Sequence, residues 1–271
     1  MRQLAQSPDS GELRVLEVPA PQLRAGGVLV RVAASVISVG TERTKIEFGA
    51  RSLLGKARAR PDQVRKVVDT ARREGALAAY RKARNKLATL SPLGYSAAGV
   101  VQAVGAGVTE LQVGDRVACA GAGYANHAEV IFVPARLVAR IPDGVEAADA
   151  AFATVGAIAL HGVRQSELRL GETALVIGLG LLGQLTVQIL RAAGVRVIGV
   201  DVDGARVELA ARHGALALLR GEDVVARVAA ATGGLGADAV LVTAATSSDD
   251  PVQLATAAAR DRGRVVVVGA V

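Results

Sequence analysis

Two kinds of residue are scarce in this sequence, and each scarcity excludes a class of site. Cys119 is the only cysteine among 271 residues, which excludes a disulfide framework and any site built from several cysteines. Aromatic residues make up only 2% of the chain, and the strongly basic segment of residues 43–86 contains only Phe48 and Tyr80. Proteins that bind single-stranded nucleic acid stack the bases on aromatic rings, so we expect no nucleic-acid partner.

Long apolar runs are also missing. The longest apolar stretch, residues 150–160, is shorter than the roughly 18 residues that a membrane-spanning helix needs. The N-terminal sequence MRQLAQSPDSGEL lacks the apolar core of a secretory signal. We therefore expect a soluble, cytoplasmic protein with no membrane partner, and the chain is long enough for two medium-sized domains.

The positive charge is concentrated in one segment. The chain carries a formal net charge of +7, and residues 43–86 hold fourteen Lys or Arg against four acidic residues. Apolar residues recur there at helical spacing, which predicts two or three basic amphipathic helices within residues 44–90, one of them ending at Gly75. These helices either form a solvated face of their own domain or bind an acidic partner.

Strand-like and helix-like segments alternate from Glu172 to the end of the chain, as a doubly wound parallel sheet requires. Helices are expected in GLLGQLTVQILRAAG and ARVELAARHG, which end at Gly194 and Gly214. Five strands are expected, and they are TALVIGLG, VRVIGVD, ALALL, ADAVLVT and RVVVVGAV.

Three glycines stand where the first of these strands meets the following helix. Gly178, Gly180 and Gly183 have the G-x-G-x-x-G spacing of a dinucleotide-binding turn. Glycine there permits the tight turn, the close approach of the backbone to a pyrophosphate and the close packing of helix on strand, and the helix N-terminus supplies oriented N–H groups. The flanking strand and helix favour this interpretation over a turn that serves packing alone.

A carboxylate follows at the position that selects the cofactor. Asp201 ends the next strand, 18 residues beyond Gly183. A carboxylate there accepts hydrogen bonds from ribose hydroxyls and repels a 2′-phosphate. Arg206 either meets such a phosphate or is a solvated helix residue. We therefore predict NAD(H), with NADP(H) as the alternative.

The first half contains short strand-like runs between Pro and Gly turns, which predicts a small antiparallel barrel. The runs are ELRVLEV, GVLVRVAASVI, AAGVVQAVG, DRVACAG, AEVIFVP and LVARIP. Together with PLGYS and the glycine turn, in this order, they resemble the medium-chain dehydrogenase/reductase family over nearly the whole chain. The resemblance implies an α/β fold: a GroES-like β-barrel domain in residues 1–150 with a basic helical insertion at 44–90, then a Rossmann domain in residues 151–271.

The zinc positions of that family are altered in this chain. The resemblance aligns a zinc-binding cysteine of the family with Ser38 or Val39, its histidine with Tyr95, and its third ligand with Thr154. None of these makes a tetrahedral zinc site, and the family's lobe with a four-cysteine structural zinc is missing, so we expect no metal.

The segments ISVGTER and GYS, with the basic stretch, are most similar to a zinc-lacking branch of the family. This branch includes bacteriochlorophyllide dehydrogenases and the N-terminal part of bi-domain oxidoreductases. The similarity implies a hydroxyl or carbonyl substrate, such as a sugar or nucleotide sugar, and a C-terminal catalytic domain as a further partner.

Tyr95 is the first predicted catalytic residue, because without zinc the substrate oxygen must be polarised by hydrogen bonds. Its predicted partner is Thr41, and Arg43 and Lys45 are close enough in sequence to lower the pKa of the phenol. The alternative is that Tyr95 is a half-buried barrel residue whose hydroxyl bonds a backbone carbonyl.

His127 is the third predicted catalytic residue, either as a proton-transfer group or as a hydrogen-bonded loop histidine. Glu42 either positions a substrate hydroxyl or caps the helix that follows it. We expect His161 on the junction helix, His213 at a helix C-terminus, and Cys119 in the core.

Further cofactor contacts are expected where later strands end at the cleft of this fold. The predicted cofactor-binding residues are Gly178, Leu179, Gly180, Leu181, Leu182, Gly183, Asp201, Arg206, Thr243, Gly269 and Ala270.

The sequence thus predicts a zinc-independent, NAD-dependent oxidoreductase that moves a hydride between nicotinamide and a small-molecule hydroxyl or carbonyl substrate. A quinone or alkene reductase of the same fold, and a non-catalytic dinucleotide-binding scaffold, remain as alternatives. Family members continue beyond the strand RVVVVGAV and often dimerise through that tail. We therefore expect a Rossmann domain that lacks its last strand, and a homodimer only if that part exists.

Overall fold

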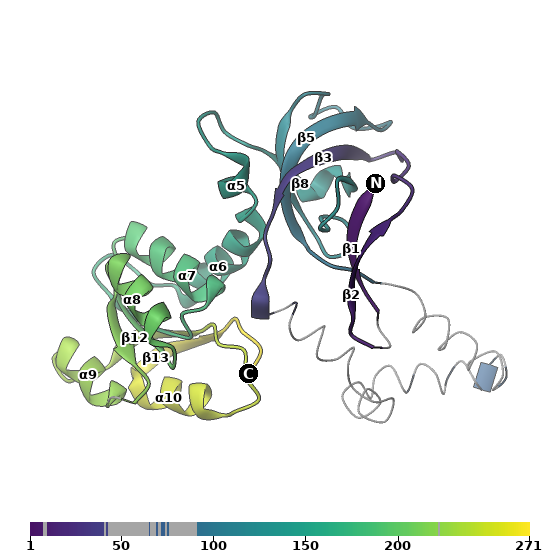
Figure 1. Cartoon of the computed structure of the whole chain (residues 1–271). Helices are drawn as coiled ribbons and strands as arrows, with labels where there is room; N and C mark the ends of the chain where they lie inside the picture. The colour runs from purple at the N-terminus through teal and green to yellow at the C-terminus, as the bar shows by residue number, and fades with distance from the viewer. Residues whose placement is uncertain are drawn as a thin grey trace. The chain divides into compact units, whose positions relative to one another are not determined.

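The computed structural model describes residues 1–7, 10–40, 42, 65, 69, 72, 73, 75, 91–221 and 223–271. Its contacts divide the chain into two compact units, Met1–Thr154 and Val155–Val271, which we call the N-terminal and C-terminal units (Figure 1). No described helix is long and apolar enough to cross a membrane.

The predicted basic insertion lies almost entirely outside the described residues, and so does Thr41. Of the described residues within it, Arg72 and Arg73 are helical and exposed. Gly75 is not helical and has a φ of 92°, which fits the predicted helix end at this glycine.

The N-terminal unit is built from two antiparallel sheets. The larger sheet has five strands in the order β7-β3-β5-β6-β8, and the smaller has three in the order β2-β1-β4. The strands of the larger sheet are β3 (Gly27–Ser35), β5 (Ser96–Val104), β6 (Arg116–Ala120), β7 (Val130–Pro134) and β8 (Val138–Arg140). Those of the smaller are β1 (Arg2–Gln6), β2 (Leu13–Glu17) and β4 (Ser91–Pro92). All six predicted strands are confirmed, whereas β1 and β4 were not predicted.

Alternating apolar residues of the larger sheet form the core of this unit. Val28 and Val30 of β3, Val101 of β5 and Val117 of β6 are fully buried in one cluster. The register between β3 and β5 shifts between Val32 and Ala34. Such an irregularity re-aims the side chains that follow it, and here it precedes the last residue of β3.

Two short helical segments flank β8, the last strand of this sheet: a 3₁₀ turn before it and an α-helix after it. The turn η1 spans Ala135–Leu137, and the helix α5 spans Ala147–Ala150. The hydroxyl of Ser96, at the start of β5, donates to the carbonyl oxygen of Ala151 at 2.5 Å, which ties α5 to the sheet.

The C-terminal unit is a parallel sheet of five strands in the order β11-β10-β9-β12-β13. The strands are β9 (Thr173–Ile177), β10 (Arg196–Asp201), β11 (Leu216–Leu219), β12 (Ala237–Val242) and β13 (Ala259–Val267). The helices are α6 (Ala153–Ser166), α7 (Leu181–Ala192), α8 (Gly204–Arg212), α9 (Val224–Ala231) and α10 (Asp250–Ala258). The five predicted strands and both predicted helices are confirmed, although β13 ends four residues earlier than expected.

The chain leaves β9 toward β10 on one side and returns to β12 on the other, which makes the carboxyl end of β9 the switch point of the sheet.

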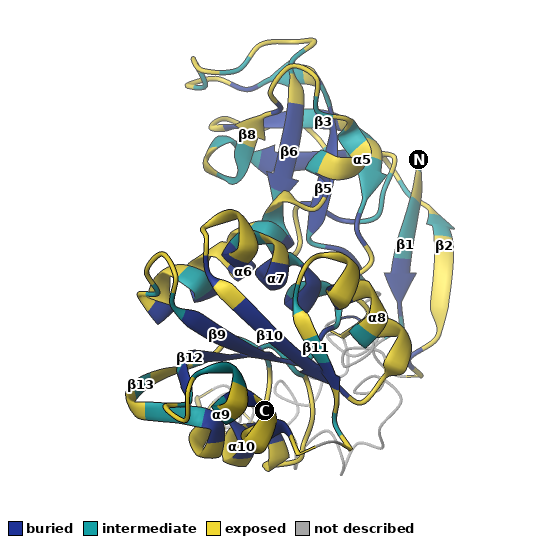
Figure 2. Ribbon diagram, turned by 90° about the vertical axis from the view of Figure 1, so that its left-hand side faces the viewer, coloured by how far each residue is buried: buried dark blue, intermediate teal, exposed yellow. Residues whose placement is uncertain are grey.

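The central strand β9 is buried on both faces, so its sequence is an unbroken run of buried residues. Leu175 and Ile177 enter one core cluster, with residues of α9 and α10. Ala174 and Val176 enter the other, with residues of α7 and α8. Figure 2 shows the buried strands between these two layers of helices.

Candidate functional site

The glycine turn, residues 178–183, lies at the switch point and is fixed by close packing. Gly178 has a φ of 93°, and a Cβ on it would lie 2.6 Å from the backbone nitrogen of Ala244. A Cβ on Gly183 would lie 1.9 Å from the carbonyl oxygen of Gly178, so α7 packs directly on the turn. A Cβ on Gly180 would meet nothing within 4 Å. Open space is therefore left beside the N-terminus of α7, where Leu181 and Leu182 provide first-turn N–H groups.

Leu179 and Asp201 connect the turn to the next strand. The Leu179 side chain is fully buried against Gly199, and its N–H donates to Oδ2 of Asp201 at 2.6 Å. The other carboxylate oxygen, Oδ1, accepts the N–H of Asp203 at 2.9 Å. Backbone donors thus hold the Asp201 carboxylate in one orientation at the carboxyl end of β10.

Arg206 lies beside this carboxylate and is half exposed. Its Nη1 is 3.8 Å from Oδ1 of Asp201, and its Nε is 3.4 Å from Oδ2 of Asp203. The structure therefore brings together Asp201 and Arg206, the two residues predicted to lie near the ribose. Arg206 lies between the carboxylates of Asp201 and Asp203.

Gln184 was missed by the sequence-based prediction. Its Nε2 donates to the carbonyl oxygens of Leu179 at 3.0 Å and Arg206 at 2.9 Å, so it joins the glycine turn to α8. Its Oε1 is buried and has no hydrogen-bond partner among the described residues. The signal in the sequence was a polar residue on the otherwise apolar face of α7.

The three later cofactor residues lie at the same edge of the sheet. Thr243 follows β12, and its hydroxyl donates to the carbonyl oxygen of Gly178 at 2.6 Å. Gly269 follows β13, and a Cβ on it would lie 1.9 Å from the carbonyl oxygen of Ala244. The carbonyl oxygen of Ala270 accepts the N–H of Thr246 at 2.9 Å. Thr243 and Gly269 thus shape the turn, and Ala270 is exposed.

A second polar group lies at one end of the larger sheet in the N-terminal unit. There β3 ends at Ser35 and the antiparallel β5 begins at Ser96, with the N–H of Val36 donating to the carbonyl oxygen of Ser96 at 3.0 Å. Tyr95 precedes β5 and is half buried. Its carbonyl oxygen accepts the N–H of Gly121, but its hydroxyl has no hydrogen bond to the part of the chain that the structure describes.

Ser35, Glu42 and His127 form a hydrogen-bonded chain at this end, which we call the histidine cluster. Nδ1 of His127 is 2.8 Å from Oγ of Ser35, and Nε2 is 3.1 Å from Oε1 of Glu42. The His127 and Glu42 side chains are only 9% and 6% exposed. Oε1 of Glu42 also accepts the N–H of Ser38 at 3.2 Å, and the N–H of Glu42 donates to the carbonyl oxygen of Ser38 at 2.8 Å. Glu42 therefore caps the backbone at Ser38 and holds His127 as well.

The backbone of neighbouring segments holds His127 in place. The N–H of His127 donates to the carbonyl oxygen of Leu93, and its own carbonyl oxygen accepts the N–H of Leu4. Gly94 has a φ of 93°, and a Cβ there would lie 2.7 Å from the His127 backbone nitrogen and 3.0 Å from Nδ1. The glycine before Tyr95 therefore leaves room for the imidazole.

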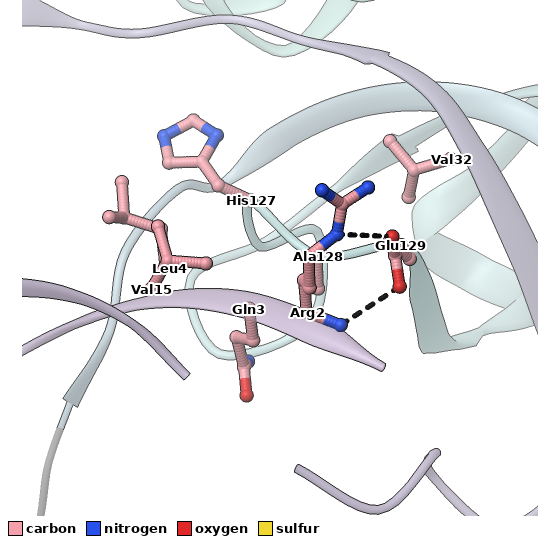
Figure 3. Close-up of a pocket in the computed structure, with 8 residues that line it drawn as sticks. All are labelled: Arg2, Gln3, Leu4, Val15, Val32, His127, Ala128 and Glu129. Carbon is pink, nitrogen blue, oxygen red and sulfur yellow. Dashed lines mark hydrogen bonds and ion pairs between the residues drawn. The ribbon is translucent and has the colours of Figure 1, made fainter. Parts of the chain in front are cut away.

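A shallow cavity of about 310 Å³ lies next to His127 (Figure 3). Its charged residues neutralise each other, since Nε and the backbone nitrogen of Arg2 each lie 2.8 Å from a carboxylate oxygen of Glu129. The cavity is lined by Arg2, Gln3, Leu4, Val15, Val32, His127, Ala128 and Glu129.

Comparisons with known proteins identify the family. Residues 182–271 match the family described as zinc-binding dehydrogenase, and residues 67–143 match the alcohol dehydrogenase GroES-like domain. The chain belongs to the medium-chain dehydrogenase/reductase family. The predicted resemblance to this family is confirmed.

Curated relatives of this medium-chain dehydrogenase/reductase include D-guloside 3-dehydrogenase of Escherichia coli K12. It is 34% identical over 157 residues, which are 56% of this chain and 44% of the relative. (R,R)-butanediol dehydrogenase of Bacillus subtilis is 31% identical over 169 residues, 52% of this chain and 49% of the relative. A quinone oxidoreductase of Pseudomonas aeruginosa is 37% identical over 128 residues, 46% of this chain and 39% of the relative. The chain spans less than half the length of these relatives.

Solved structures of the same fold cover the whole chain. Alcohol dehydrogenase TADH from Thermus sp. ATN1 has a TM-score of 0.78 at 24% identity, with 100% of this chain and 78% of that one covered. Escherichia coli quinone oxidoreductase, complexed with NADPH, has a TM-score of 0.72 at 21% identity, with 98% and 72% covered. These likenesses confirm the predicted fold class, a barrel domain followed by a parallel α/β sheet.

The described residues of this medium-chain dehydrogenase/reductase do not fit a zinc ion. They contain no group of three or more His, Cys, Asp or Glu side chains placed to bind a metal. Burial raises the pKa of Cys119 to about 12, so its sulfur is a protonated thiol in the core of the metal-free chain. Thr154 donates its hydroxyl to the carbonyl oxygen of Cys119 at 3.3 Å.

The two remaining histidines lie where the sequence predicted them. His161 is on α6 and exposed, and His213 is the C-terminal capping residue of α8. Neither belongs to the glycine turn or the histidine cluster. Of the predicted catalytic residues, the structure places Tyr95 and His127 at the same end of one sheet, and Thr41 lies outside the described residues.

Proposed function

We propose that this chain is the dinucleotide-binding and catalytic part of a zinc-independent, NAD-dependent oxidoreductase. The observation that carries the proposal is the glycine turn, whose open side at Gly180 faces no protein atom within 4 Å while a fixed carboxylate stands on the next strand. The substrate is a hydroxyl or carbonyl compound. The relation to a D-guloside 3-dehydrogenase supports a sugar or sugar derivative as the class.

The residues of the turn fit a dinucleotide. First-turn N–H groups of α7 bind the pyrophosphate, because they lack partners within the helix and lie at its positive end. The Asp201 carboxylate accepts one backbone N–H on each oxygen, which leaves lone pairs on both oxygens for the ribose hydroxyls. Bound NAD supplies the hydride acceptor.

We propose NAD over NADP because the Asp201 charge repels a 2′-phosphate. Arg206 favours the alternative, since a guanidinium binds phosphate well, and the quinone oxidoreductase of the same fold was solved with NADPH. The pairing of Arg206 with both Asp201 and Asp203 supports NAD, since it occupies the guanidinium with carboxylates.

Tyr95 replaces zinc in this proposal. A phenol donates a hydrogen bond to the substrate oxygen and stabilises the charge that develops there when hydride moves. Among the described residues, its hydroxyl has no hydrogen-bond partner. Thr41 is the further predicted member of this group, with Arg43 and Lys45 close to it in sequence, and all three lie outside the described residues.

The proposal is tested by following NADH absorbance with purified chain and a panel of aldehydes, ketones and oxidised sugars, with and without a zinc chelator. Turnover that survives the chelator supports the proposal. Turnover that the chelator abolishes and zinc restores would overturn its zinc-independent form.

A second candidate function is reduction of a quinone or activated alkene. The 37% identity to a quinone oxidoreductase favours it, and so does the lack of a zinc site among the described residues. Quinones added to the same panel decide between the two. NADH consumption with quinones and with no carbonyl compound would select this function.

A further inference from the structure

We propose that Ser35, His127 and Glu42 are a proton relay, and that Ser35 is the residue that exchanges a proton with the substrate hydroxyl. This inference rests on the proposed oxidoreductase function. It assigns roles to Ser35 and Glu42, and it changes the role of His127 from a direct acid or base to the second member of a chain.

Both ring nitrogens of His127 are occupied. Nδ1 contacts Oγ of Ser35 at 2.8 Å and Nε2 contacts Oε1 of Glu42 at 3.1 Å. His127 lines the adjoining cavity, but its side chain is only 9% exposed and both ring nitrogens bond protein groups, so a proton reaches either nitrogen through Ser35 or Glu42. Glu42 is more deeply buried than His127, whereas Ser35 is partly exposed at the end of β3. Of the two partners, Ser35 is therefore the one that a ligand can reach.

Glu42 sets the direction of the two hydrogen bonds that His127 makes. An ionised carboxylate only accepts, so a hydrogen on Nε2 of His127 is directed at Glu42. In the neutral ring Nδ1 is then an acceptor, and the hydroxyl of Ser35 donates to it. Glu42 thereby fixes the Nε2–H tautomer of His127, in which Nδ1 can accept the proton of the Ser35 hydroxyl. This is the arrangement in which a histidine activates a hydroxyl and a carboxylate orients the histidine.

The surrounding backbone holds the relay residues in place. Backbone hydrogen bonds to Leu93 and Leu4 hold His127 on both sides, and Gly94 packs against its ring. The register shift before Ala34 turns the end of β3, and Glu42 is held by two hydrogen bonds to the backbone of Ser38. Such positioning is what proton transfer within a protein requires.

The charged groups around the imidazole agree with this assignment. Glu42 is the only described carboxylate that contacts the ring. Arg2 and Glu129, which line the adjoining cavity with His127, form an ion pair with each other (Figure 3). Because Arg2 and Glu129 neutralise each other, the positive charge that forms on His127 is balanced by Glu42.

The proton balance is complete when the substrate is an alcohol. Bound NAD would accept the hydride of the carbinol carbon; the alcohol proton would pass to Oγ of Ser35, and the Ser35 proton would pass to Nδ1 of His127. Once the carbonyl product has formed, His127 is an imidazolium that is paired with the Glu42 carboxylate. Return of that proton through Ser35 to water restores the neutral ring, and carbonyl reduction runs the same path backward.

The test begins with imidazole nitrogen NMR, which needs no substrate. The chain has only three histidines, so His127→Gln identifies the His127 signals. We expect the Nε2–H tautomer in the wild type and a mixture of tautomers in Glu42→Gln. A wild-type ring that carries its hydrogen on Nδ1 would overturn the proposed direction of the relay.

Turnover then separates the relay from a merely structural cluster. Ser35→Ala is expected to lower kcat about 100-fold and to change the shape of the pH profile of kcat, with NADH affinity unchanged. Ser35→Thr keeps a hydroxyl and is expected to restore most of the rate. Ser96→Ala is the matched control, because its hydroxyl lies at the same sheet end but donates to the Ala151 carbonyl oxygen and not to His127.

The two proposals fail in different ways. An active wild type whose rate and pH profile survive Ser35→Ala would overturn the relay alone. A wild type that binds NADH but oxidises and reduces nothing would overturn the oxidoreductase function, and with it the catalytic role of Ser35.

Discussion

The glycine turn and the histidine cluster are fixed by different kinds of contact. In the glycine turn, carbonyl and N–H groups of the backbone meet each other at distances that leave no room for a Cβ on Gly178 or Gly183. In the histidine cluster, two hydrogen bonds join His127 to Ser35 and Glu42, which lie 92 and 85 residues before it in the chain. The turn therefore depends on residue size, and the cluster depends on residue chemistry. Substitutions that change only one of these properties separate the two regions.

The largest expected effect is on chemistry alone. Tyr95→Phe removes a hydroxyl that bonds no described residue, so the free energy of unfolding should change by less than about 0.5 kcal/mol. Turnover should fall by about 100- to 1000-fold, the usual cost of losing one preorganised donor to a developing oxyanion. Steady-state kinetics and chemical denaturation measure the two quantities. An unchanged kcat would remove Tyr95 from the mechanism.

Gly183→Ala should have the largest effect on structure. Its Cβ would lie 1.9 Å from the Gly178 carbonyl oxygen, which is backbone and cannot move aside as a side chain would. We expect a loss of about 3 kcal/mol in the free energy of unfolding of the C-terminal unit, with loss of NADH binding.

Gly180→Ala is the matched control. Gly180 has an ordinary φ of −68°, and its Cβ would enter open space. Stability should be unchanged while NADH binding weakens, because the added methyl occupies the space proposed for the pyrophosphate. A stable Gly180→Ala protein with full NADH affinity would show that the turn serves packing alone.

Gly94→Ala tests whether size also matters beside the histidine cluster. The residue has a positive φ, and its Cβ would press on His127, so we expect a loss of about 2 kcal/mol in the free energy of unfolding and a shift of the His127 imidazole signals. Gly123→Ala carries similar strain, with a φ of 85° and open space around its Cβ. If both variants shifted the His127 signals equally, the close packing of Gly94 on His127 would not be the cause.

The smallest expected effect concerns Cys119. With a pKa of about 12, only about one thiol in ten thousand is ionised at pH 8. A thiol reagent should leave the folded protein unmodified and label it fully in denaturant, as mass spectrometry would show. Fast labelling of the folded protein would mean that Cys119 is an exposed thiolate, and the argument against a metal thiolate would fail.

The glycine turn could be predicted because its information is local. One strand-helix-strand unit contains all of its predicted residues, which are Gly178, Gly180, Gly183 and Asp201. A single periodic pattern therefore places them at one edge of the sheet. Gln184 was not predicted as a site residue, because the same pattern indicates only that position 184 is buried. Its role depends on carbonyl groups of Leu179 and Arg206 that only the folded turn brings within reach.

The histidine cluster could be predicted only in part. His127 and Glu42 were considered separately, and nothing in their spacing of 85 residues indicates contact. Ser35 was missed because it is the last residue of an ordinary alternating strand, and the register shift that aims it is a property of the pair β3 and β5. The strand β1 was missed for a similar reason, since RQLAQ is too polar to resemble a strand before its partners are known.

Calorimetric titration with NADH and NADPH tests the central claim most directly, on the wild type, on Asp201→Asn and on Asp203→Asn. The account predicts that the wild type binds NADH at least tenfold more tightly than NADPH, and that Asp201→Asn loses this preference because the charge is gone while the shape remains. Asp203→Asn should keep it, because an asparagine still caps α8 and the Asp201 charge is untouched. No binding of either dinucleotide by the folded wild type, or an equal preference in all three proteins, would contradict the account.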